Sequence, residues 1–386
     1  MFNHLYVNNF KSIIDEPIAL DSLNVLSGIN GSGKSTICQI FLLLKEYFEH
    51  YNEDVSTVSL NNKYMDLGRI QDILNEGASE EKIDISFNHS GSEYSFELDA
   101  SNELSTNDFA KVNSSPVDHH HLKSIFSKIK YLRAERLGPR VVQEKDDYSV
   151  RVLRDIGISG EFVNSFLEYY GKEIVDFENR FHINSESEQL SHQVGLWLNE
   201  ISPNISYHTN ELQNTDFVGV QYNFATKMGH SQGYRATNVG FGISYILPVI
   251  VMCLSASPGD ILIIDTPEAH LHPKGQSKIG ELLANTAADG VQIIVETHSD
   301  HVINGIRKQV IKKKIKPENT NFYYFSLISG ADVFSPCTKV VKPTIDINGM
   351  FDEWPDGFFD EWSTSLSELI KLRTIDMAST EEDNKQ

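Results

Sequence analysis

The chain has 386 residues, 40% of them hydrophobic, which is enough for a large buried core and for two or three subdomains. Its formal net charge of −21 opposes binding to anionic membranes, and it opposes binding to nucleic acid unless basic residues cluster on one surface. The longest apolar run, residues 243–254, contains Pro248 and is shorter than the about 18 residues of a membrane span, so we expect no membrane partner.

The first third of the chain alternates between strand-like and helical patterns. Short strand-like pieces cover residues 1–26, and a helix is predicted over 36–44. Residues 82–99 alternate around an Asn-His-Ser-Gly turn, which is typical of a β-hairpin. We interpret the polar run 101–118 as a loop. We also interpret the three histidines that follow it as part of an exposed loop, because no second group of metal ligands lies near them in sequence.

The rest of the chain predicts a mainly parallel sheet. The segment IKYLRAERLGPR, residues 129–140, resembles a strand with several arginines at its far end, and residues 150–212 have the spacing of a helical insertion. Beyond them, strands predicted at 260–265, 291–296 and 322–327 alternate with helices predicted at 242–254, 275–288 and 299–313. This alternation predicts an α/β fold and excludes all-α and all-β folds.

The three cysteines, Cys38, Cys253 and Cys337, are far apart in sequence, and two of them lie in apolar runs. This spacing fits neither a disulfide framework nor a zinc site. The N-terminal residues also lack the pattern of a signal peptide. We therefore predict a cytoplasmic protein.

A phosphate-binding loop is the clearest functional signal. The sequence NVLSGINGSGKST, residues 24–36, matches G-x-x-x-x-G-K-[ST] through Gly28, Gly33, Lys34 and Ser35, between a predicted strand and a predicted helix. Its glycines let successive backbone N–H groups point at phosphate oxygens, while Lys34 would neutralise the β- and γ-phosphates and Ser35 would hold Mg²⁺. The residues predicted to bind the nucleotide are Asn30, Gly31, Ser32, Gly33, Lys34, Ser35 and Thr36. The motif alone leaves kinases, GTPases, helicases and ABC-type ATPases open.

Two further strand ends carry polar side chains suited to such a site. Asp265 follows four apolar residues in ILIIDTPEAHLHP, as does the carboxylate that holds Mg²⁺ in phosphate-binding-loop proteins. His298 follows the next apolar strand, in VETHSD. Because both strands are predicted to be parallel, both side chains are expected at the carboxyl edge of the sheet, where His298 could reach the γ-phosphate.

Together these segments resemble the RecF/SMC/OLD-type branch of the ABC ATPases. The resemblance is carried by NFKSI, the phosphate-binding loop, NVGFGISYILPVI, ILIIDTPEAHLHP and VETHSDH. The chain also looks like a single-chain prokaryotic group with YLRAERLGPR in the middle and FDEWPDGFFDE near the end. The resemblance implies an ABC-type ATPase head that uses ATP and Mg²⁺. It divides the chain into the first half of the head with an antiparallel β subdomain (1–149), the helical insertion (150–212), the second half of the head (213–342) and a C-terminal docking tail (343–386).

The same resemblance implies a homodimer or a higher oligomer, built from heads that meet head to tail. In that branch a glycine-serine segment of one head caps the nucleotide of the other, and here the segment is Gly240, Gly242 and Ser244. The alternative is that these glycines only cap a helix and do not contact a nucleotide. Gln71 corresponds to a Mg²⁺-sensing glutamine, although it could equally be an ordinary helix-surface residue.

One position departs from the family pattern. The acid that usually follows the Mg²⁺-binding aspartate and orients the attacking water is replaced by Thr266. Either Glu268 takes over this role, or hydrolysis is slow and the bound nucleotide acts as a switch. The catalytic residues that we predict are Lys34, Asp265, Glu268 and His298.

The predicted function is an ATPase that regulates a separately encoded effector, such as a nuclease, in anti-phage defence or DNA maintenance. OLD nucleases carry a Toprim domain after the ATPase, and too few residues follow His298 for such a domain. The alternative is a RecF-like clamp that closes on DNA, for which the basic residues at 307–316 are the best candidates, together with Arg133, Arg136 and Arg140. The acidic residues at 346–360 alternate with aromatic ones and favour a docking tail over a metal site.

Overall fold

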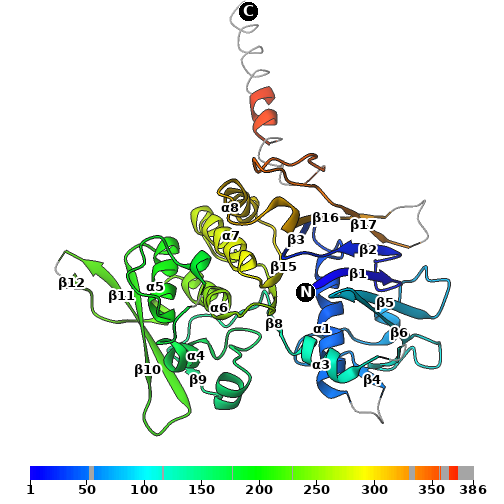
Figure 1. Cartoon of the computed structure of the whole chain (residues 1–386), viewed down its shortest axis with the longest axis horizontal. Helices are drawn as coiled ribbons and strands as arrows, with labels where there is room; N and C mark the ends of the chain where they lie inside the picture. The colour runs from blue at the N-terminus through cyan, green and yellow to red at the C-terminus, as the bar shows by residue number, and fades with distance from the viewer. Residues whose placement is uncertain are drawn as a thin grey trace, which may run out of the picture.

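The computed structural model describes residues 1–51, 56–114, 117–175, 177–227, 229–329, 335–355, 357 and 365–372. Two lobes flank a central sheet in this part of the chain (Figure 1). The blue and cyan lobe comes from the N-terminal residues, and the green lobe comes from the middle of the chain. Within the described residues, no helix combines the length and the hydropathy that a membrane span requires.

The central sheet has the strand order β17-β16-β3-β15-β14-β8. Its strands are β17 (Cys337–Val341), β16 (Thr320–Ile328), β3 (Leu23–Gly28), β15 (Gln292–Glu296), β14 (Ile261–Asp265) and β8 (Ile129–Leu132). The strands from β16 to β8 are parallel, and β17 pairs antiparallel with β16. The mainly parallel sheet predicted from the sequence is confirmed.

Helices cover both faces of this sheet, and each face has its own core. They are α1 (Lys34–His50), α6 (Phe241–Ser255), α7 (Pro273–Ala288) and α8 (Asp300–Ile311). Along β14, Leu262 and Ile264 pack in the core that contains α6, α7 and α8, whereas Ile261 and Ile263 pack in the core that contains α1. Burial on both faces explains why β14 reads as an unbroken apolar run.

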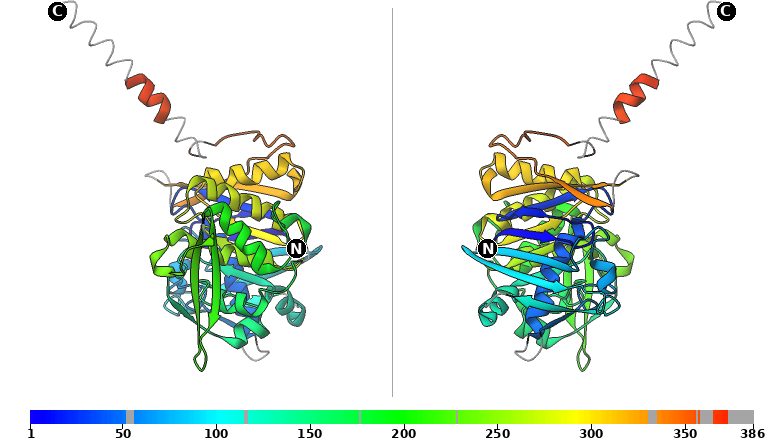
Figure 2. Two further views of the ribbon diagram at one scale, coloured as in Figure 1. Left: turned by 90° about the vertical axis from the view of Figure 1, so that its left-hand side faces the viewer. Right: turned by 90° about the vertical axis from the view of Figure 1, so that its right-hand side faces the viewer.

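An antiparallel sheet builds most of the N-terminal lobe, in the order β2-β1-β5-β6-β7-β4. Its strands are β2 (Glu16–Ala19), β1 (Phe2–Asn8), β5 (Lys82–His89), β6 (Ser92–Asp99), β7 (Phe109–Ser114) and β4 (Thr57–Ser59). The right-hand view of Figure 2 shows its blue and cyan strands side by side. Ser90 and Gly91 join β5 to β6 with φ angles of 52° and 89°, so the predicted hairpin is confirmed.

Two local predictions in this lobe are wrong. The polar run 101–118 contains β7, where Ala110 and Val112 are the buried positions, and two small apolar residues give a weak strand signal. The histidines after it open a helix, α3 (His119–Phe126). The Asp118 carboxylate caps this helix by accepting a hydrogen bond from His121 N at 3.0 Å.

The second lobe is mixed, although its segment 150–212 was expected to be helical. It contains α4 (Val163–Tyr170) and α5 (Leu190–Ile201) together with β9 (Val142–Glu144), β10 (Ile205–Glu211), β11 (Phe217–Thr226), β12 (Gly229–His230) and β13 (Tyr234–Arg235). β10 pairs antiparallel with β11 along its whole length. Ile205 is the one fully buried residue of β10, so this strand lacks a clear apolar alternation.

The described chain also contains a helix at residues 365–372 and several short helical turns. The turns are α2 (Ile70–Ile73), a π-helical turn (Tyr148–Val152) and three 3₁₀ turns (Glu178–Arg180, Ala236–Asn238 and Pro317–Asn319).

Part of the expected docking tail packs on the head. Phe351 is largely buried, and its ring lies 4.8 Å from the ring of Phe322 in β16 and 5.1 Å from the ring of Trp354. The carboxylates of Asp346 and Asp352 accept hydrogen bonds within their own turns. The remaining acidic and aromatic residues of the motif, Asp356, Phe358, Phe359 and Asp360, lie outside the described residues.

Candidate functional site

The phosphate-binding loop joins β3 to α1 at the carboxyl edge of the central sheet, and two of its glycines cannot be replaced without displacing backbone or side chains. Gly28 and Gly33 have φ angles of 136° and 102°. A Cβ at Gly28 would lie 2.1 Å from the Phe325 carbonyl oxygen, and one at Gly33 would lie 2.6 Å from Thr338 Oγ1. Thr338 Oγ1 also donates to the Ser32 carbonyl at 2.9 Å. Strands β16 and β17 therefore support the curled loop from behind.

The loop borders a cavity of about 580 Å³. The cavity is lined by Lys11, Ser12, Asn30, Gly31, Ser32, Gly33, Lys34, Ser35, Thr36, Gln39, Asp72, Glu296 and His298. All seven loop residues proposed to bind the nucleotide are among them, as is His298. The sequence analysis did not assign the other lining residues a role. Two sequence features could have identified some of them: the NFKSI segment, which contains Lys11 and Ser12, and Glu296, the acid that precedes Thr297 and His298.

Lys34 is the buried cation of this cavity. Its Nζ donates to the carbonyl oxygens of Gly28 at 3.0 Å and Ile29 at 2.7 Å, and it lies 3.9 Å from Glu296 Oε1. Burial lowers the pKa of Lys34, while Glu296 and Asp265 oppose this shift. The buried Lys34 ammonium is thus held against the loop backbone, where phosphate oxygens could replace its carbonyl partners.

Asp265 and Glu296 end neighbouring strands and are paired in register. Asp265 is partly buried, does not line the cavity, and accepts a hydrogen bond from Thr266 Oγ1 at 2.6 Å. Thr266 itself has a φ of 46°, an unfavourable value for a β-branched residue. Its amide donates to the Glu296 carbonyl at 2.8 Å, and the Arg136 guanidinium donates to the carbonyls of Asp265 and Thr266. These bonds hold the turn in place.

Arg136 reaches this turn from the segment after β8 and is almost completely buried. Burial lowers its pKa to about 10, against the opposing effects of Asp265 and Glu268. The sequence analysis placed this arginine at a strand end but gave it no partner. In the structure it is a support for the Asp265 turn rather than an exposed phosphate-binding cation.

Glu268 connects the turn after β14 to the turn after β15. Its Oε1 accepts a hydrogen bond from His298 N at 2.7 Å, while its buried Oε2 has no hydrogen-bond partner. Burial raises the pKa of this carboxyl group. Burial and the nearby Lys34 lower the pKa of the His298 imidazole, which favours its neutral form. Glu268 itself does not line the cavity.

Glu296 is the carboxylate that reaches the cavity wall beside Lys34. It is 5% exposed, and its Oε2 has no hydrogen-bond partner. Burial and the neighbouring Asp265 raise its pKa to about 7, although contacts with Ser35 and Lys34 act in the opposite direction. A carboxylate of this kind is stabilised in its charged form by an added cation.

The glycine-serine segment lies on the other face of the sheet. Gly240 is the N-cap residue of α6, and a Cβ there would meet no atom within 4 Å. At Gly242 a Cβ would lie 2.6 Å from the His270 carbonyl, and Ser244 contacts the Tyr222 hydroxyl. Because α6 packs in the core opposite α1, none of these three residues lines the described cavity.

A family model described as "AAA domain, putative AbiEii toxin, Type IV TA system" matches residues 23–304. The chain belongs to the AAA_21 family. A second model, described as "Protein of unknown function (DUF3696)", matches residues 315–369, which include the WPDGFFDE motif. No curated protein matches this AAA_21 chain.

Solved structures of SMC heads are similar to this AAA_21 chain. One is a crystal structure of an SMC head bound to the C-winged helix domain of ScpA, with 16% identity over 89% of this chain and 98% of that chain, and a TM-score of 0.56. Another, derived from Pyrococcus furiosus, is an SMC head with an extended coiled coil bound to the C-terminal domain of ScpA. It has 14% identity over 96% and 99% of the two chains, and a TM-score of 0.50. The family makes the chain an AAA-type ATPase, and its fold is similar to that of SMC heads.

Gln71 of this AAA_21 chain lies outside the described cavity, whereas the next residue, Asp72, lines it. Gln71 lies in the short helix α2, is exposed, and is not among the residues that line the described cavity. Asp72, the next residue, lines the cavity, and its Oδ2 accepts a hydrogen bond from Arg69 N at 2.8 Å. A role for Gln71 in Mg²⁺ binding remains a prediction.

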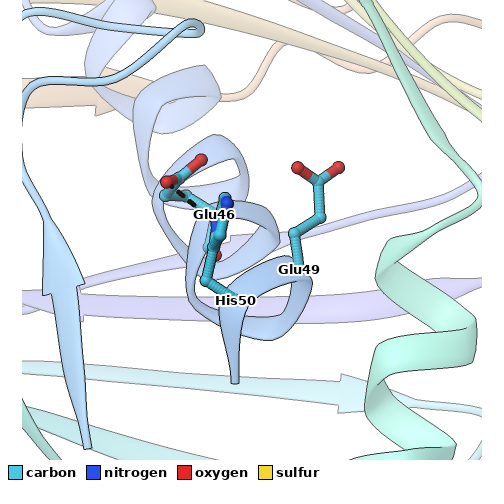
Figure 3. A group of neighbouring side chains, drawn as sticks. All are labelled: Glu46, Glu49 and His50. Atoms are coloured by element: carbon cyan, nitrogen blue, oxygen red, sulfur yellow. Dashed lines mark hydrogen bonds and ion pairs between the residues drawn. The ribbon is translucent and has the colours of Figure 1, made fainter. Parts of the chain in front are cut away.

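A second group of potential metal ligands lies near the end of α1, where Glu46, Glu49 and His50 approach one another within 4.8 Å (Figure 3). Glu49 is bound by Lys45 at 2.8 Å and by the Tyr64 hydroxyl at 2.6 Å. Although burial opposes the shift, these contacts lower the pKa of Glu49 to about 2. His50 Nδ1 lies 3.1 Å from Glu46 Oε1. We interpret the group as an ion-pair network and assign no metal to it.

Proposed function

We propose that the chain binds Mg-ATP in the cavity at the phosphate-binding loop and hydrolyses it. The observation that carries this proposal is the convergence of the curled loop, the buried Lys34 and the buried Glu296 on one cavity. The positive φ angles of Gly28 and Gly33 allow the tight curl that can turn successive backbone N–H groups toward bound phosphates. The unpartnered Glu296 Oε2 fits a cation beside them.

Each residue has a distinct part in this proposal. The backbone amides of residues 30–36 and the start of α1 bind the phosphates, and Lys34 neutralises their β/γ region. Ser35 and Asp265 would hold Mg²⁺, which would supply charge neutralisation at the phosphates. His298, at the cavity wall, contacts the γ-phosphate. Binding in this geometry positions the γ-phosphate for in-line attack by water.

Glu268 is the residue that we propose to orient the attacking water. Thr266 has no carboxylate and uses its hydroxyl to bind Asp265. Glu268, by contrast, has one carboxylate oxygen that accepts a hydrogen bond from His298 N. Its other oxygen is buried and has no partner, so it could accept a hydrogen bond from a water. Because a buried carboxylate with a raised pKa is a stronger base than an exposed one, this assignment is chemically reasonable for proton abstraction from water.

Two heads meet head to tail in the active form that we propose. Gly240, Gly242 and Ser244 lie away from the cavity of their own chain, so they could cap only a nucleotide held by another chain. The positive N-terminal end of α6 and the open space at Gly240 suit the approach of a γ-phosphate.

The assembled ATPase regulates a separately encoded effector, for which a nuclease is the leading candidate. The family description names a toxin and a type IV toxin–antitoxin system, which is in keeping with a role in prokaryotic defence. Co-expression with the protein encoded by the neighbouring gene tests this part. A complex that forms only with ATP supports it, and the absence of any complex speaks against that protein as the effector.

The nucleotide site is tested with a fluorescent ATP analogue. The parent chain is expected to bind the analogue with Mg²⁺ present and to release phosphate from ATP, whereas Lys34→Ala should lose binding by at least tenfold because the phosphates lose their buried cation. Lys45→Ala, at the other end of α1, is the matched control. Equal binding by the parent and Lys34→Ala would remove the assignment of this site.

A further inference from the structure

Three neighbouring strands end at one edge of the central sheet, and the middle one ends at Glu296. In the sheet order, β15 lies between β3, which leads into the phosphate-binding loop, and β14, which ends at Asp265. Glu296 is paired in register with Leu26 on one side and with Asp265 on the other. Its side chain therefore stands between the loop and the residue proposed to hold Mg²⁺.

Of the two carboxylates at these strand ends, Glu296 is the one that lines the cavity. Its Oε1 lies 3.9 Å from Lys34 Nζ, and its side chain contacts that of Ser35. Asp265 stands behind it, with one oxygen bound to Thr266. A cation held by the Ser35 hydroxyl would therefore find the Glu296 carboxylate on the cavity wall beside it.

The charges around Glu296 leave room for an added cation. The carboxyl groups that face it are Asp265 and Glu268, and the cation beside it is Lys34. Arg136 is nearby but directs its hydrogen bonds to the carbonyls of Asp265 and Thr266. The Glu296 Oε2 is buried and has no hydrogen-bond partner. Buried carboxylates are normally paired or coordinate metals, so this arrangement is incomplete without a further positive charge.

We propose that Glu296 is a second carboxylate of the Mg²⁺ site and holds the ion from the β15 side, together with Ser35 and Asp265. Carboxylate and hydroxyl oxygens are the ligands that Mg²⁺ prefers. The inference rests on the proposed function, because it assigns a residue to the same nucleotide site. It makes Glu296 a ligand and not merely the anchor that holds Lys34.

Magnesium-dependent nucleotide binding tests this proposal. The fluorescent ATP analogue is titrated into the parent chain and into Glu296→Gln, first in EDTA and then over a range of free Mg²⁺. In EDTA the two chains should bind the analogue equally well within about threefold, because Gln keeps the shape and can still contact Lys34. The Mg²⁺ concentration at half-saturation should rise at least tenfold in Glu296→Gln, because an amide is a weak Mg²⁺ ligand.

Two further variants serve as controls. Glu46→Gln changes another buried glutamate with an unpartnered Oε2, at the far end of α1, and should keep the parental Mg²⁺ dependence. Glu296→Asp keeps the charge on a shorter side chain and should recover part of the lost Mg²⁺ affinity. Circular dichroism establishes that each variant is folded.

The outcomes separate this inference from the proposed function. If Glu296→Gln and Glu296→Asp both keep the parental Mg²⁺ dependence, Glu296 is not a ligand and the inference is overturned alone. A loss of binding that is equal in EDTA and in Mg²⁺ also overturns it, since that pattern belongs to an anchor of Lys34. If the parent chain binds no analogue in either condition, the proposed function falls, and this inference falls with it.

Discussion

Thr266 stands at the position where the resemblance to ABC ATPases implies an acid that orients water. It adopts a φ of 46°, and its hydroxyl binds Asp265 Oδ1 at 2.6 Å. The turn is secured by its own amide on the Glu296 carbonyl and by Arg136 on two carbonyls. Threonine here fixes the orientation of Asp265 but cannot accept a proton from water. In the proposed reaction the water is therefore oriented by another residue, and Glu268 is the candidate that this turn provides.

Substitution of Glu268 by Gln is expected to slow ATP hydrolysis by about 10²–10⁴-fold and to trap bound ATP, because the amide keeps the hydrogen bond from His298 N but cannot act as a base. Thr266→Glu in this background should restore part of the rate by supplying a carboxylate one residue after Asp265. Single-turnover hydrolysis, with nucleotide binding measured in parallel, gives the comparison. Unchanged turnover in Glu268→Gln would leave His298 or a group from a second chain to position the water.

The pKa of Glu296 predicts a pH-dependent stability in the absence of Mg²⁺ and nucleotide. Burial and Asp265 raise this pKa from 4.5 to about 7, so the folded chain holds the proton more tightly than the unfolded chain. The stabilisation is fully present below pH 4.5 and is lost as the pH rises through 7. The free energy of unfolding should fall by up to about 3 kcal/mol across this range.

Urea unfolding at pH 5 and pH 8 in EDTA measures this difference. The Glu296→Gln chain should lose less stability between the two pH values than the parent, because the amide does not ionise. Glu268 also has a raised pKa, so some pH dependence should persist in the variant. An identical loss of stability in both chains would show that Glu296 ionises at its ordinary pKa in the folded state.

At the scale of elements, the N-terminus of α6 does not line the described cavity of its own chain. Phe241, its first residue, is 59% exposed, and its ring lies 6.0 Å from the His270 ring in the loop after β14. The same loop packs against Gly242, where a Cβ would be 2.6 Å from the His270 carbonyl. The proposed nucleotide-capping surface is thus in direct contact with the loop that begins at Asp265.

Ser244→Arg should leave ATP binding by the separate chain within about threefold of the parent while blocking the ATP-dependent dimer, because a long cation would fill the space next to the capped phosphate. Ser244→Ala is the control for loss of the Tyr222 contact and should still dimerise. Mass photometry with and without ATP measures the result. A Ser244→Arg chain that dimerises as the parent does would refute the capping role of this segment.

The elements that the sequence predicted well are those with strong and regular patterns. The strands β14 and β15 are buried at nearly every position. The helices α7 and α8 begin and end within a few residues of their predicted bounds. The missed elements β7 and β10 have one face on solvent and few large apolar residues. Their existence depends on pairing with β6 and β11, which is information that a local pattern does not contain.

The candidate site divides in the same way. The seven predicted nucleotide-binding residues, 30–36, are contiguous in sequence, and all of them line one cavity. Glu296 was passed over because it completes an apolar strand, and the strand order that places it beside Lys34 is a long-range property. The sequence likewise placed Arg136 at a strand end. It could not show the carbonyl groups that Arg136 binds, because these lie about 130 positions further along the chain.

At the scale of the whole molecule, the net charge of −21 bears on the choice between an effector-regulating ATPase and a DNA clamp. The basic residues at 307–316 were the main support for the clamp. In the structure, Arg307 donates to the Gly349 carbonyl, and Lys312 lies 3.5 Å from Glu281. Lys308 and Lys314 contact Ser277 and Asn179. Much of this cluster is therefore engaged with the chain itself.

Duplex DNA should consequently bind weakly, and its affinity should fall only gently as salt is raised. A protein that neutralises Z phosphates loses affinity with a slope of roughly −0.9Z in a plot of log K against log salt, so a cluster with few free cations predicts a slope shallower than about −3. Fluorescence anisotropy with labelled DNA, with ATP and without it, measures this slope. Lys313→Glu and Lys316→Glu together should then change the affinity by less than about threefold. Tight binding at low salt with a steep slope, lost in this double variant and strengthened by ATP, would instead identify the chain as an ATP-gated DNA clamp, and the effector hypothesis would have to give way to it.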